Sequence, residues 1–509
     1  MPASSTPSRR RSTRSSSLTA PGAGSATKAT QTTKIAQSLW SFLLCGLCVS
    51  GVAASPRRAE HALVSDLNRI FHAPAMSEGV WGVEVKSLDS GKTLYSLNPG
   101  TLMMPASNMK ILTLAAAAET LGWDFRFKTR LETTAPIENG ALKGDLFLVG
   151  GGDPTINSRD DRAEHVLDEW AASLKAAGIT RIDGNLVGDG SVFEPNGLGQ
   201  GWSWDYLQYG YAAPASALEF DENTATLRIT PGANPGDQAK LELSADTGLG
   251  LVHHVTTGAA GSPAVIDYER LPNDHWLDVA GSIAVDAKPV ARDVAVSNPT
   301  RYFARMVLNG LTARGIAIMG LPLDRTDQTV LEPGPRRVLV ESLSAPLREI
   351  AKTMMKVSQN LYAETLLRTV GKQKAHDVLT AWNIPDRTFV QADGSGLSRY
   401  DYVTADVIVI ILERMFKDPR HRDPFTTALP IAGADGTVAS RLKNTRAQDN
   451  ALVKTGSISN VRALSGYVRT RSGETLAFSI LANAFTVAPA TVNWIADVAV
   501  EELANYSER

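Results

Sequence analysis

The chain has 509 residues, of which 43% are hydrophobic and 20% charged, so it is long enough for roughly three domains with buried cores. Its formal net charge is −2 at pH 7. Without the six basic residues of positions 1–54, 45 basic residues remain against 53 acidic ones, a net charge of about −8. Affinity for nucleic acid and anionic lipid comes mainly from Lys and Arg, so this balance disfavours both as partners.

Residues 1–54 differ in composition from the rest of the chain. They contain no acidic residue, are rich in Ser and Thr, and include an apolar run at 39–52 that ends next to small residues. This pattern is typical of a secretory signal and predicts export to the periplasm, with at most peripheral membrane association; a buried helix or an uncleaved anchor is the alternative. Both cysteines, Cys45 and Cys48, lie in the apolar run, so no disulfide or thiol ligand is expected in the mature protein.

The N-terminal part of the remaining chain mixes helical and strand patterns. Apolar residues recur at helical spacing over 60–71, and 79–97 alternates as two strands around a polar turn. The Ala-rich segment 111–121 predicts a strongly apolar helix. Short strands broken by Gly, Pro and Asp then prevail from 125 to about 343. Two further helices are predicted within that stretch, at 163–177 and 298–315.

Helical patterns return after position 343. Helices are predicted at 346–355, 360–370, 404–416 and 489–504, and strands at 464–469 and 475–483. Helices towards both ends of the sequence, with a pair of strands between them, indicate one α/β domain. Its two halves are separated by a large, mainly β insertion.

Three short motifs follow one another in a fixed order. They are Ser107-Asn-Met-Lys110, Ser358-Gln-Asn360 and Lys454-Thr455-Gly456. Each one alone fits an ordinary helix start or strand end, whereas the three together in this order form the signature of serine acyltransferases. The triple therefore predicts an enzyme that forms a covalent intermediate on its own serine.

The spacing of the first motif has a chemical reason. Residues three apart at a helix start share one face, so the Lys110 amine can reach the Ser107 hydroxyl. A lysine takes the serine proton only if burial and nearby positive charge lower its pKa, and Lys454 would supply that charge. Free N–H groups at the helix start would also face the attacked carbonyl. The alternative is an ordinary helix with Ser107 as N-cap and Lys110 solvated.

The second motif opens another predicted helix. Ser358 is a candidate to relay a proton to the leaving amine. Asn360 is a candidate to bind the substrate amide and to hold Lys110 in place. A plain N-cap serine is the alternative.

The third motif lies in an apolar stretch that predicts a buried strand. A strand edge beside the nucleophile would let the substrate backbone add as a further strand. Lys454 and Thr455 would bind a terminal carboxylate, and the N–H groups of Ser457 and Ser107 would form an oxyanion hole. The alternative is an ordinary strand that ends in a turn at Gly456.

Other motifs give weaker signals of function. No H-E-x-x-H occurs and the eight histidines are scattered, so we expect no metal site and no cofactor. Residues 150–155 lack the G-K-[ST] ending of a phosphate-binding loop and indicate a turn. The aromatic residues between 202 and 211 favour a small core, with a sugar-stacking surface as the alternative.

The chain resembles the low-molecular-mass class C penicillin-binding proteins, which are D-alanyl-D-alanine carboxypeptidases and endopeptidases. The three motifs and the long gap between Ser107 and Ser358 carry the resemblance. So do the segments Gly-Asp153-Pro-Thr, Asp393-Gly-Ser-Gly-Leu-Ser-Arg399 and 429–437. It implies cleavage of the terminal D-Ala-D-Ala bond of peptidoglycan stem peptides through an acyl-enzyme on Ser107. It also implies acylation by β-lactams, and it leaves the oligomeric state open.

The resemblance also implies a domain plan. A transpeptidase-like and β-lactamase-like α/β domain, an antiparallel sheet flanked by helices, would consist of 55–127 and 339–509. A mainly β insertion of two smaller domains would interrupt it: a second domain of 128–160 and 216–338, and a nested third domain of 161–215.

Two residues are implied to contact the substrate side chain. By resemblance, Asp153 and Arg399 lie near the diaminopimelate side chain of the stem peptide. The chain departs from the family after Gly456, where it carries Ser-Ile-Ser and relatives often carry Thr-Leu and a longer polar residue. The rival readings are a β-lactamase and a non-catalytic peptidoglycan-binding protein. The complete motif set argues against the second, and Ser358, where class C β-lactamases carry a tyrosine, argues against the first.

Overall fold

The computed structural model describes residues 56–508, except for 245, 273 and 328–333. The predicted secretory signal therefore lies outside the described residues. Within the described part of the chain, none of the helices combines the length and the apolar character needed to cross a membrane.

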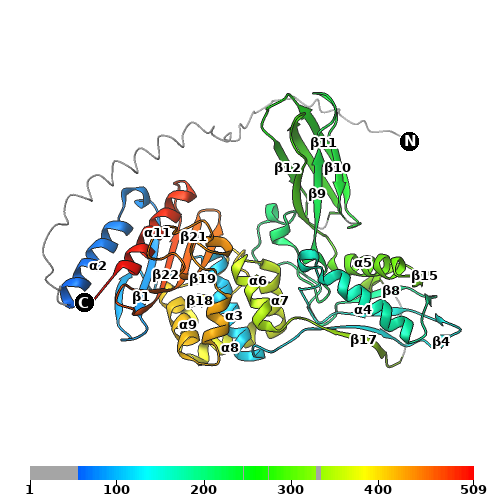
Figure 1. The fold of residues 1–509 in the computed structure, drawn as a ribbon, viewed down its shortest axis with the longest axis horizontal. Helices are drawn as coiled ribbons and strands as arrows, with labels where there is room; N and C mark the ends of the chain where they lie inside the picture. The colour runs from blue at the N-terminus through cyan, green and yellow to red at the C-terminus, as the bar shows by residue number, and fades with distance from the viewer. Residues whose placement is uncertain (1–55, 245, 273, 328–333, 509) are drawn as a thin grey trace, which may run out of the picture. The chain divides into compact units, whose positions relative to one another are not determined.

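One antiparallel sheet combines strands from both ends of the described chain (Figure 1). Its order is β2-β1-β22-β21-β20. The strands are β1 (Val80–Ser87), β2 (Thr93–Leu97), β20 (Leu452–Ile458), β21 (Val461–Arg469) and β22 (Thr475–Asn483). β1 pairs with β22 along its whole length, from Val80 opposite Asn483 to Ser87 opposite Leu476. The N-terminal and C-terminal parts of the chain thus form a single layer.

Helices cover both faces of this sheet. On one face α2 packs against α11, and both share a core with strand residues such as Val83, Leu464 and Phe478. On the other face α3 contacts α6, α7, α8 and α9. The helices are α2 (Pro56–Phe71), α3 (Met109–Leu121), α6 (Leu347–Lys356), α7 (Asn360–Val370), α8 (Lys372–Ala381), α9 (Ala405–Lys417), α10 (Arg422–Ala428) and α11 (Pro489–Asn505). A short strand pair, β18 (Phe389–Val390) and β19 (Tyr402–Val403), precedes α9.

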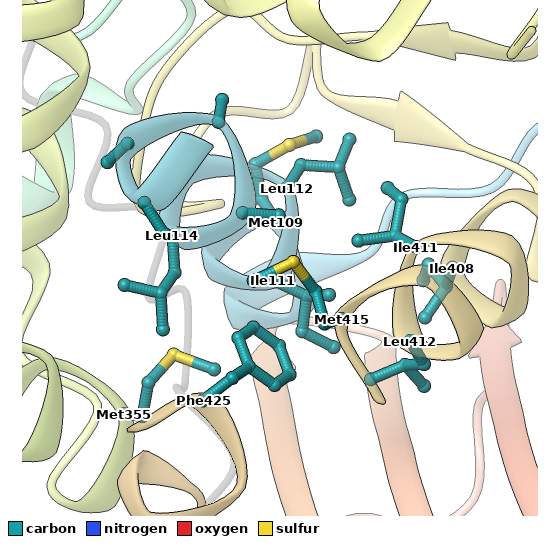
Figure 2. Packing of buried hydrophobic residues seen from close by; sticks show 14 of the residues in the cluster. Met109, Ile111, Leu112, Leu114, Met355, Ile408, Ile411, Leu412, Met415 and Phe425 are labelled. Atoms are coloured by element: carbon teal, nitrogen blue, oxygen red, sulfur yellow. The ribbon is translucent and has the colours of Figure 1, made fainter. Parts of the chain in front are cut away.

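Helix α3 lies at the centre of this domain. All of its residues from Met109 to Ala118 are buried. Figure 2 shows its Leu and Ile side chains among Met355 of α6 and Ile411 and Met415 of α9. A helix that is apolar on all sides is stable only inside a core. The composition of α3 therefore buries the helix, and with it Lys110 in its first turn, inside the domain.

The insertion leaves and re-enters this domain through two paired strands. β3 (Lys128–Thr133) runs antiparallel to β17 (Arg337–Leu343). They belong to a five-stranded sheet of order β16-β8-β6-β3-β17, which shares one core with α4 and α5. A four-stranded sheet has the order β15-β7-β5-β4. The remaining elements are β4 (Ile137–Glu138), β5 (Ala141–Leu142), β6 (Leu146–Val149), α4 (Arg162–Ala176), β7 (Arg181–Ile182), β8 (Leu186–Asp189), α5 (Pro299–Ala313), β15 (Ala317–Ile318) and β16 (Pro322–Asp324).

Within the insertion, residues 224–295 form a unit with its own core. Two three-stranded sheets, β10-β9-β14 and β11-β13-β12, bury Leu227, Val255 and Val279 among others. The strands are β9 (Thr224–Thr230), β10 (Lys240–Leu243), β11 (Gly250–Gly258), β12 (Val265–Glu269), β13 (Trp276–Ala284) and β14 (Val290–Ala295).

This unit is not where we expected the nested domain. We predicted that domain at 161–215, but α4 and β8, which lie in that range, belong to the larger core of the insertion. Trp170 of α4 packs there with Leu146 of β6 and Phe303 of α5, and β8 pairs with β6 in parallel. The apolar face of an amphipathic helix must be covered, and the neighbouring sheet covers it here. The nested unit is instead the all-β segment that follows.

Candidate active site

The turn that carries Ser107 is approached closely by two other segments. Ser107 lies in the 3-10 turn Ala106–Asn108, directly before α3. A Cβ on Gly456 of β20 would lie 2.6 Å from the Pro105 carbonyl oxygen, and a Cβ on Gly396 would lie 1.8 Å from the Ala106 carbonyl oxygen. Only glycine allows these approaches, because real Cβ atoms do not come that close. Glycine at these two positions thus allows the third motif and the 393–399 segment to meet at the serine.

Lys110 is completely buried below Ser107. Its Nζ donates to Ser107 Oγ at 2.9 Å, to Asn360 Oδ1 at 2.6 Å and to the Ser395 carbonyl at 2.8 Å. Burial lowers the pKa of Lys110 to about 7, against the opposing effect of nearby carboxylates, Asp393 first. The solvated Lys110 of our alternative interpretation is therefore wrong.

The segment that receives Lys110 is held by buried carboxylates that the motifs did not reveal. Glu364 Oε1 accepts the N–H groups of Gly394 at 3.0 Å and Ser395 at 2.8 Å. Asp393 accepts the N–H of Gly396 at 2.7 Å and the indole N–H of Trp202 at 2.8 Å. Burial and the charge of Asp393 raise the pKa of Glu364 to about 7. The sequence signal for this network is the polar segment 393–399 itself.

Ser358 and Lys454 form the second polar pair of the site. Lys454 Nζ donates to Ser358 Oγ and to the Thr455 carbonyl, both at 2.8 Å. Ser358 has φ of 61°, in the left-handed region that costs a non-glycine residue about 1–3 kcal/mol. Burial and then the positive charge of Lys110 lower the pKa of Lys454 well below its usual range. We expected burial and the charge of Lys454 to lower the pKa of Lys110; burial is the largest cause, and the repulsion between the two amines opposes the charging of both at once.

The third motif lies on the edge of the sheet. β20 is the last strand, and Ile431 bridges its outer edge at Leu452, before the motif begins. Thr455 Oγ1 donates to Thr437 Oγ1 at 2.7 Å, so a second hydroxyl from the 429–437 segment stands beside the motif. Asn108 Nδ2 donates to the Lys454 carbonyl at 2.9 Å and ties the turn that carries Ser107 to the strand. Both Thr437 and Asn108 are site residues that the motif analysis did not single out.

A cavity of about 320 Å³ opens above Ser107. It is lined by Ser107, Tyr206, Tyr211, Ser358, Asn360, Gly396, Leu397, Ser457, Ile458 and Ser459. The two tyrosines come from the insertion: the Tyr206 hydroxyl lies 3.3 Å from Ser459 Oγ, and Asn360 Nδ2 donates to the Tyr211 carbonyl at 2.7 Å. The aromatic loop that we interpreted as a small core therefore also forms a wall of the site.

The two residues that resemblance implied for contact with the substrate side chain have different surroundings in the structure. Arg399 Nη2 donates to the Ser459 carbonyl at 3.3 Å, at the edge of the cavity. Asp153 is not among the residues that line the cavity. Its carboxylate is 1% exposed, accepts the N–H of Thr155 at 2.9 Å and pairs with Arg162 at 3.1 Å. Asp153 is thus an internal ion-pair partner, because Arg162 and the turn at Thr155 already use its oxygens.

One group of side chains elsewhere has the composition of a metal site. Glu119, Asp418 and His421 offer ligand atoms within 4.8 Å of one another. Arg420 pairs with both carboxylates, and the Trp123 indole donates to His421 Nδ1 at 3.0 Å. An indole N–H only donates, so His421 carries its proton on Nε2 and donates it to Glu119 at 3.0 Å. The cluster is a satisfied ion-pair network.

A serine next to a buried amine, beside an open strand edge at the centre of an α/β domain, defines a serine enzyme of the acyl-transfer class. The sequence matches the D-Ala-D-Ala carboxypeptidase 3 (S13) family over residues 63–504, and the chain belongs to that family.

Individual relatives agree with this assignment. A D-alanyl-D-alanine carboxypeptidase from an Actinomadura species is 34% identical over 85% of this chain and 84% of its own. The D-alanyl-D-alanine carboxypeptidase DacB of Haemophilus influenzae is 30% identical over 80% of this chain and 85% of its own. The crystal structure of penicillin-binding protein 4 from the same organism superposes with a TM-score of 0.76, at 29% identity, over 87% of this chain and 99% of its own. The chain is therefore a serine-type D-Ala-D-Ala carboxypeptidase in class, and its α/β domain is interrupted by an insertion.

Proposed function

We propose that Ser107 is the nucleophile that attacks the carbonyl of the penultimate D-alanine of a peptidoglycan stem peptide. The Ser107 proton passes to Lys110, the Oγ–carbon bond forms, and the C–N bond to the terminal D-alanine breaks. Water then hydrolyses the ester. The observation that carries this proposal is the 2.9 Å contact between Ser107 Oγ and the amine of a buried lysine.

Lys110 suits the role of base because its pKa matches the working pH. With a pKa of about 7, roughly half of the amine is neutral at neutral pH and available to accept a proton. A lysine with its ordinary pKa of about 10.4 would be neutral in less than ~0.1% of molecules. Asn360 fixes the amine through Oδ1 and is itself fixed by the Tyr211 carbonyl. Its contact with the substrate amide stays a prediction.

Lys454 and Ser358 act on the leaving D-alanine in this proposal. Ser358 Oγ contacts Lys454 Nζ, so a proton from Lys454 reaches the departing amine through the hydroxyl. The terminal carboxylate of the substrate would bind beside Lys454, Thr455 and Thr437. A carboxylate favours the charged form of a nearby amine, so its arrival would raise the pKa of Lys454. The new positive charge would in turn favour neutral Lys110, which links substrate recognition to activation of the base.

The open edge of β20 supports binding of the substrate backbone as an added strand. The N–H groups of Ser107 and Ser457 are the oxyanion-hole donors in this proposal. Gly456 permits the short distance between the strand and the nucleophile turn on which such a pair of donors depends.

The side chain before D-Ala-D-Ala would meet Arg399 and the aromatic loop of the insertion. Asp205, which directly precedes Tyr206 of the cavity wall, is the candidate carboxylate for this contact in our proposal, in place of Asp153, whose oxygens are used internally. Burial chiefly, and to a lesser extent charges that include Asp205, raise the pKa of Tyr211 in the same wall. A carboxylate and a guanidinium at the cavity edge fit a side chain that bears both an ammonium and a carboxylate, as diaminopimelate does.

Peptidoglycan peptides and β-lactams are the partners that follow from this chemistry. A β-lactam presents an acylating carbonyl and a carboxylate, and one of the solved structures that this chain resembles is a complex with a β-lactam, at a TM-score of 0.71 and 27% identity. Peptidoglycan lies outside the cytoplasmic membrane, so the proposal also requires export, and we propose the periplasm as the place of action.

The test is D-alanine release from a synthetic pentapeptide that ends in D-Ala-D-Ala. Wild-type protein is expected to release one equivalent, and Ser107→Ala none. Thr491→Ala, a partly buried hydroxyl at the start of α11 on the opposite face of the sheet, serves as the matched control and should keep full activity. Release at the wild-type rate by Ser107→Ala would refute the proposal. Incubation with a cross-linked dimer in the same assay measures endopeptidase activity.

A further inference from the structure

A second cavity adjoins the one above Ser107. It measures about 360 Å³ and shares Ser457, Ile458 and Ser459 with the first. Its other lining residues are Asn460, Arg462, Phe485, Thr486, Val487 and Pro489. The end of β20 is therefore a common wall, with the proposed reaction site on one side and an unassigned space on the other.

Arg462 gives this second cavity a positive charge. In the β20–β21 ladder it lies directly opposite Ser457. Its Nη1 donates to the Ile458 carbonyl at 2.9 Å and the Val461 carbonyl at 2.6 Å, and its guanidinium lies 5.9 Å from the centre of the Phe485 ring. The guanidinium is thus held in a fixed place at the hairpin end.

No carboxylate among the described residues neutralises Arg462. It contacts two backbone carbonyl oxygens and the Phe485 ring. Burial and the charge of Arg441 lower its pKa, and Arg441 is itself paired with Asp497 at 2.7 Å. Arginine stays protonated under these conditions. A half-buried, unpaired cation on a cavity wall favours an anionic ligand.

The direction of the substrate along β20 decides which part of it would reach this cavity. If the terminal carboxylate binds near Lys454, the acyl side runs past Ser457 towards Ser459, antiparallel to β20. Substituents of an extended chain alternate between the two faces of a sheet. If the residue before D-Ala-D-Ala fills the first cavity, the preceding residue points to the opposite face, where Arg462 lies.

We propose that the Arg462 cavity is a second acyl-side subsite, which binds a carboxylate one residue upstream of the side chain in the first cavity. The inference rests on the proposed function and adds a substrate feature to it. The enzyme would distinguish stem peptides with a free carboxylate at that position from those in which it is amidated.

The experiment uses two synthetic peptides ending in D-Ala-D-Ala that differ only in this upstream carboxylate or carboxamide. For the wild type, kcat/KM is expected to be roughly 5- to 30-fold higher for the carboxylate, the range for a charge-assisted hydrogen bond at a partly exposed cation. Arg462→Gln should reduce the ratio to about one, and Arg462→Lys should keep part of it. The matched control is Arg469→Gln, an exposed arginine on the same strand, which should keep the full ratio.

Penicillin acylation, which does not involve the upstream carboxylate, separates this inference from the function on which it rests. It should proceed at the wild-type rate in Arg462→Gln. If Arg462→Gln loses labelling because the hairpin is disturbed, the test is made with Arg462→Lys instead. A lysine variant that is labelled normally but has the same kcat/KM for both peptides overturns the inference. So does an equal kcat/KM for both peptides in the wild type, or a full ratio in Arg462→Gln. Absence of both D-alanine release and labelling in the wild type overturns the proposed function itself.

Discussion

The pH dependence of acylation tests the role of Lys110 quantitatively. Protonation removes the base, so the second-order rate constant for acylation should follow the neutral fraction of Lys110 and fall as the pH drops through its pKa. With a pKa of about 7, this fraction rises from roughly 9% at pH 6 to about 97% at pH 8.5, a ~10-fold gain followed by a plateau. An ordinary lysine would give a ~300-fold gain over the same interval and no plateau.

The assay is labelling by a fluorescent penicillin, quenched at timed intervals between pH 5.5 and 9.5 at constant ionic strength. The second-order constant reports the free enzyme, so the midpoint belongs to the site before ligand binds. Circular dichroism at each pH confirms that the protein stays folded. A rate that is flat across the range, or one that still rises tenfold per pH unit above pH 8.5, would refute the assignment of Lys110 as the base.

Glu364→Gln refines the same measurement. Glutamine keeps the Oε1 atom that accepts the N–H groups of Gly394 and Ser395, while the negative charge that raises the pKa of Lys110 is lost. The midpoint of the acylation profile should therefore move to lower pH. A midpoint shifted to higher pH would mean that the carboxylate network does not act on Lys110 in this way.

Two further substitutions distinguish residues that serve the reaction from residues that serve stability. Gly456→Ala places a Cβ 2.6 Å from the Pro105 carbonyl oxygen, so penicillin labelling should slow by at least ~10-fold, and an unchanged rate would contradict the packing argument. Asp153→Asn loses the ion pair with Arg162, whose side chain is partly exposed, and should lower the free energy of unfolding by about 1–2 kcal/mol in thermal denaturation. KM should stay the same, and a raised KM with unchanged stability would mean that Asp153 contacts the substrate.

The motifs predicted which residues would meet because the three of them, in this order, form the signature of one kind of chemistry. Lys110, Asn360 and Lys454 do converge on Ser107 and Ser358. The family assignment and the interrupted α/β domain follow from the same residues. The motifs do not reveal the surrounding groups that set the pKa values of the motif residues. In the sequence Glu364 cannot be told from an ordinary helical glutamate, because its burial and its N–H partners are known only from the structure.

The insertion was harder to predict because its pairing is non-local. β6 pairs in parallel with β8 across the whole of α4, and short strands carry too few residues to show such a partner in their sequence. The boundary of the nested unit was misplaced for that reason. The role of Asp153 could not be predicted for a similar reason. The resemblance identified the residue, but its carboxylate pairs with Arg162, which lies seven positions beyond Thr155 and outside the recognised segment.

Mass spectrometry of the penicillin adduct tests the central claim most directly. Protein incubated with penicillin and digested with trypsin should carry the penicilloyl group on the peptide of residues 93–110, with fragment ions that place it on Ser107. An adduct on any other residue, or an unmodified 93–110 peptide from folded protein, would contradict the account.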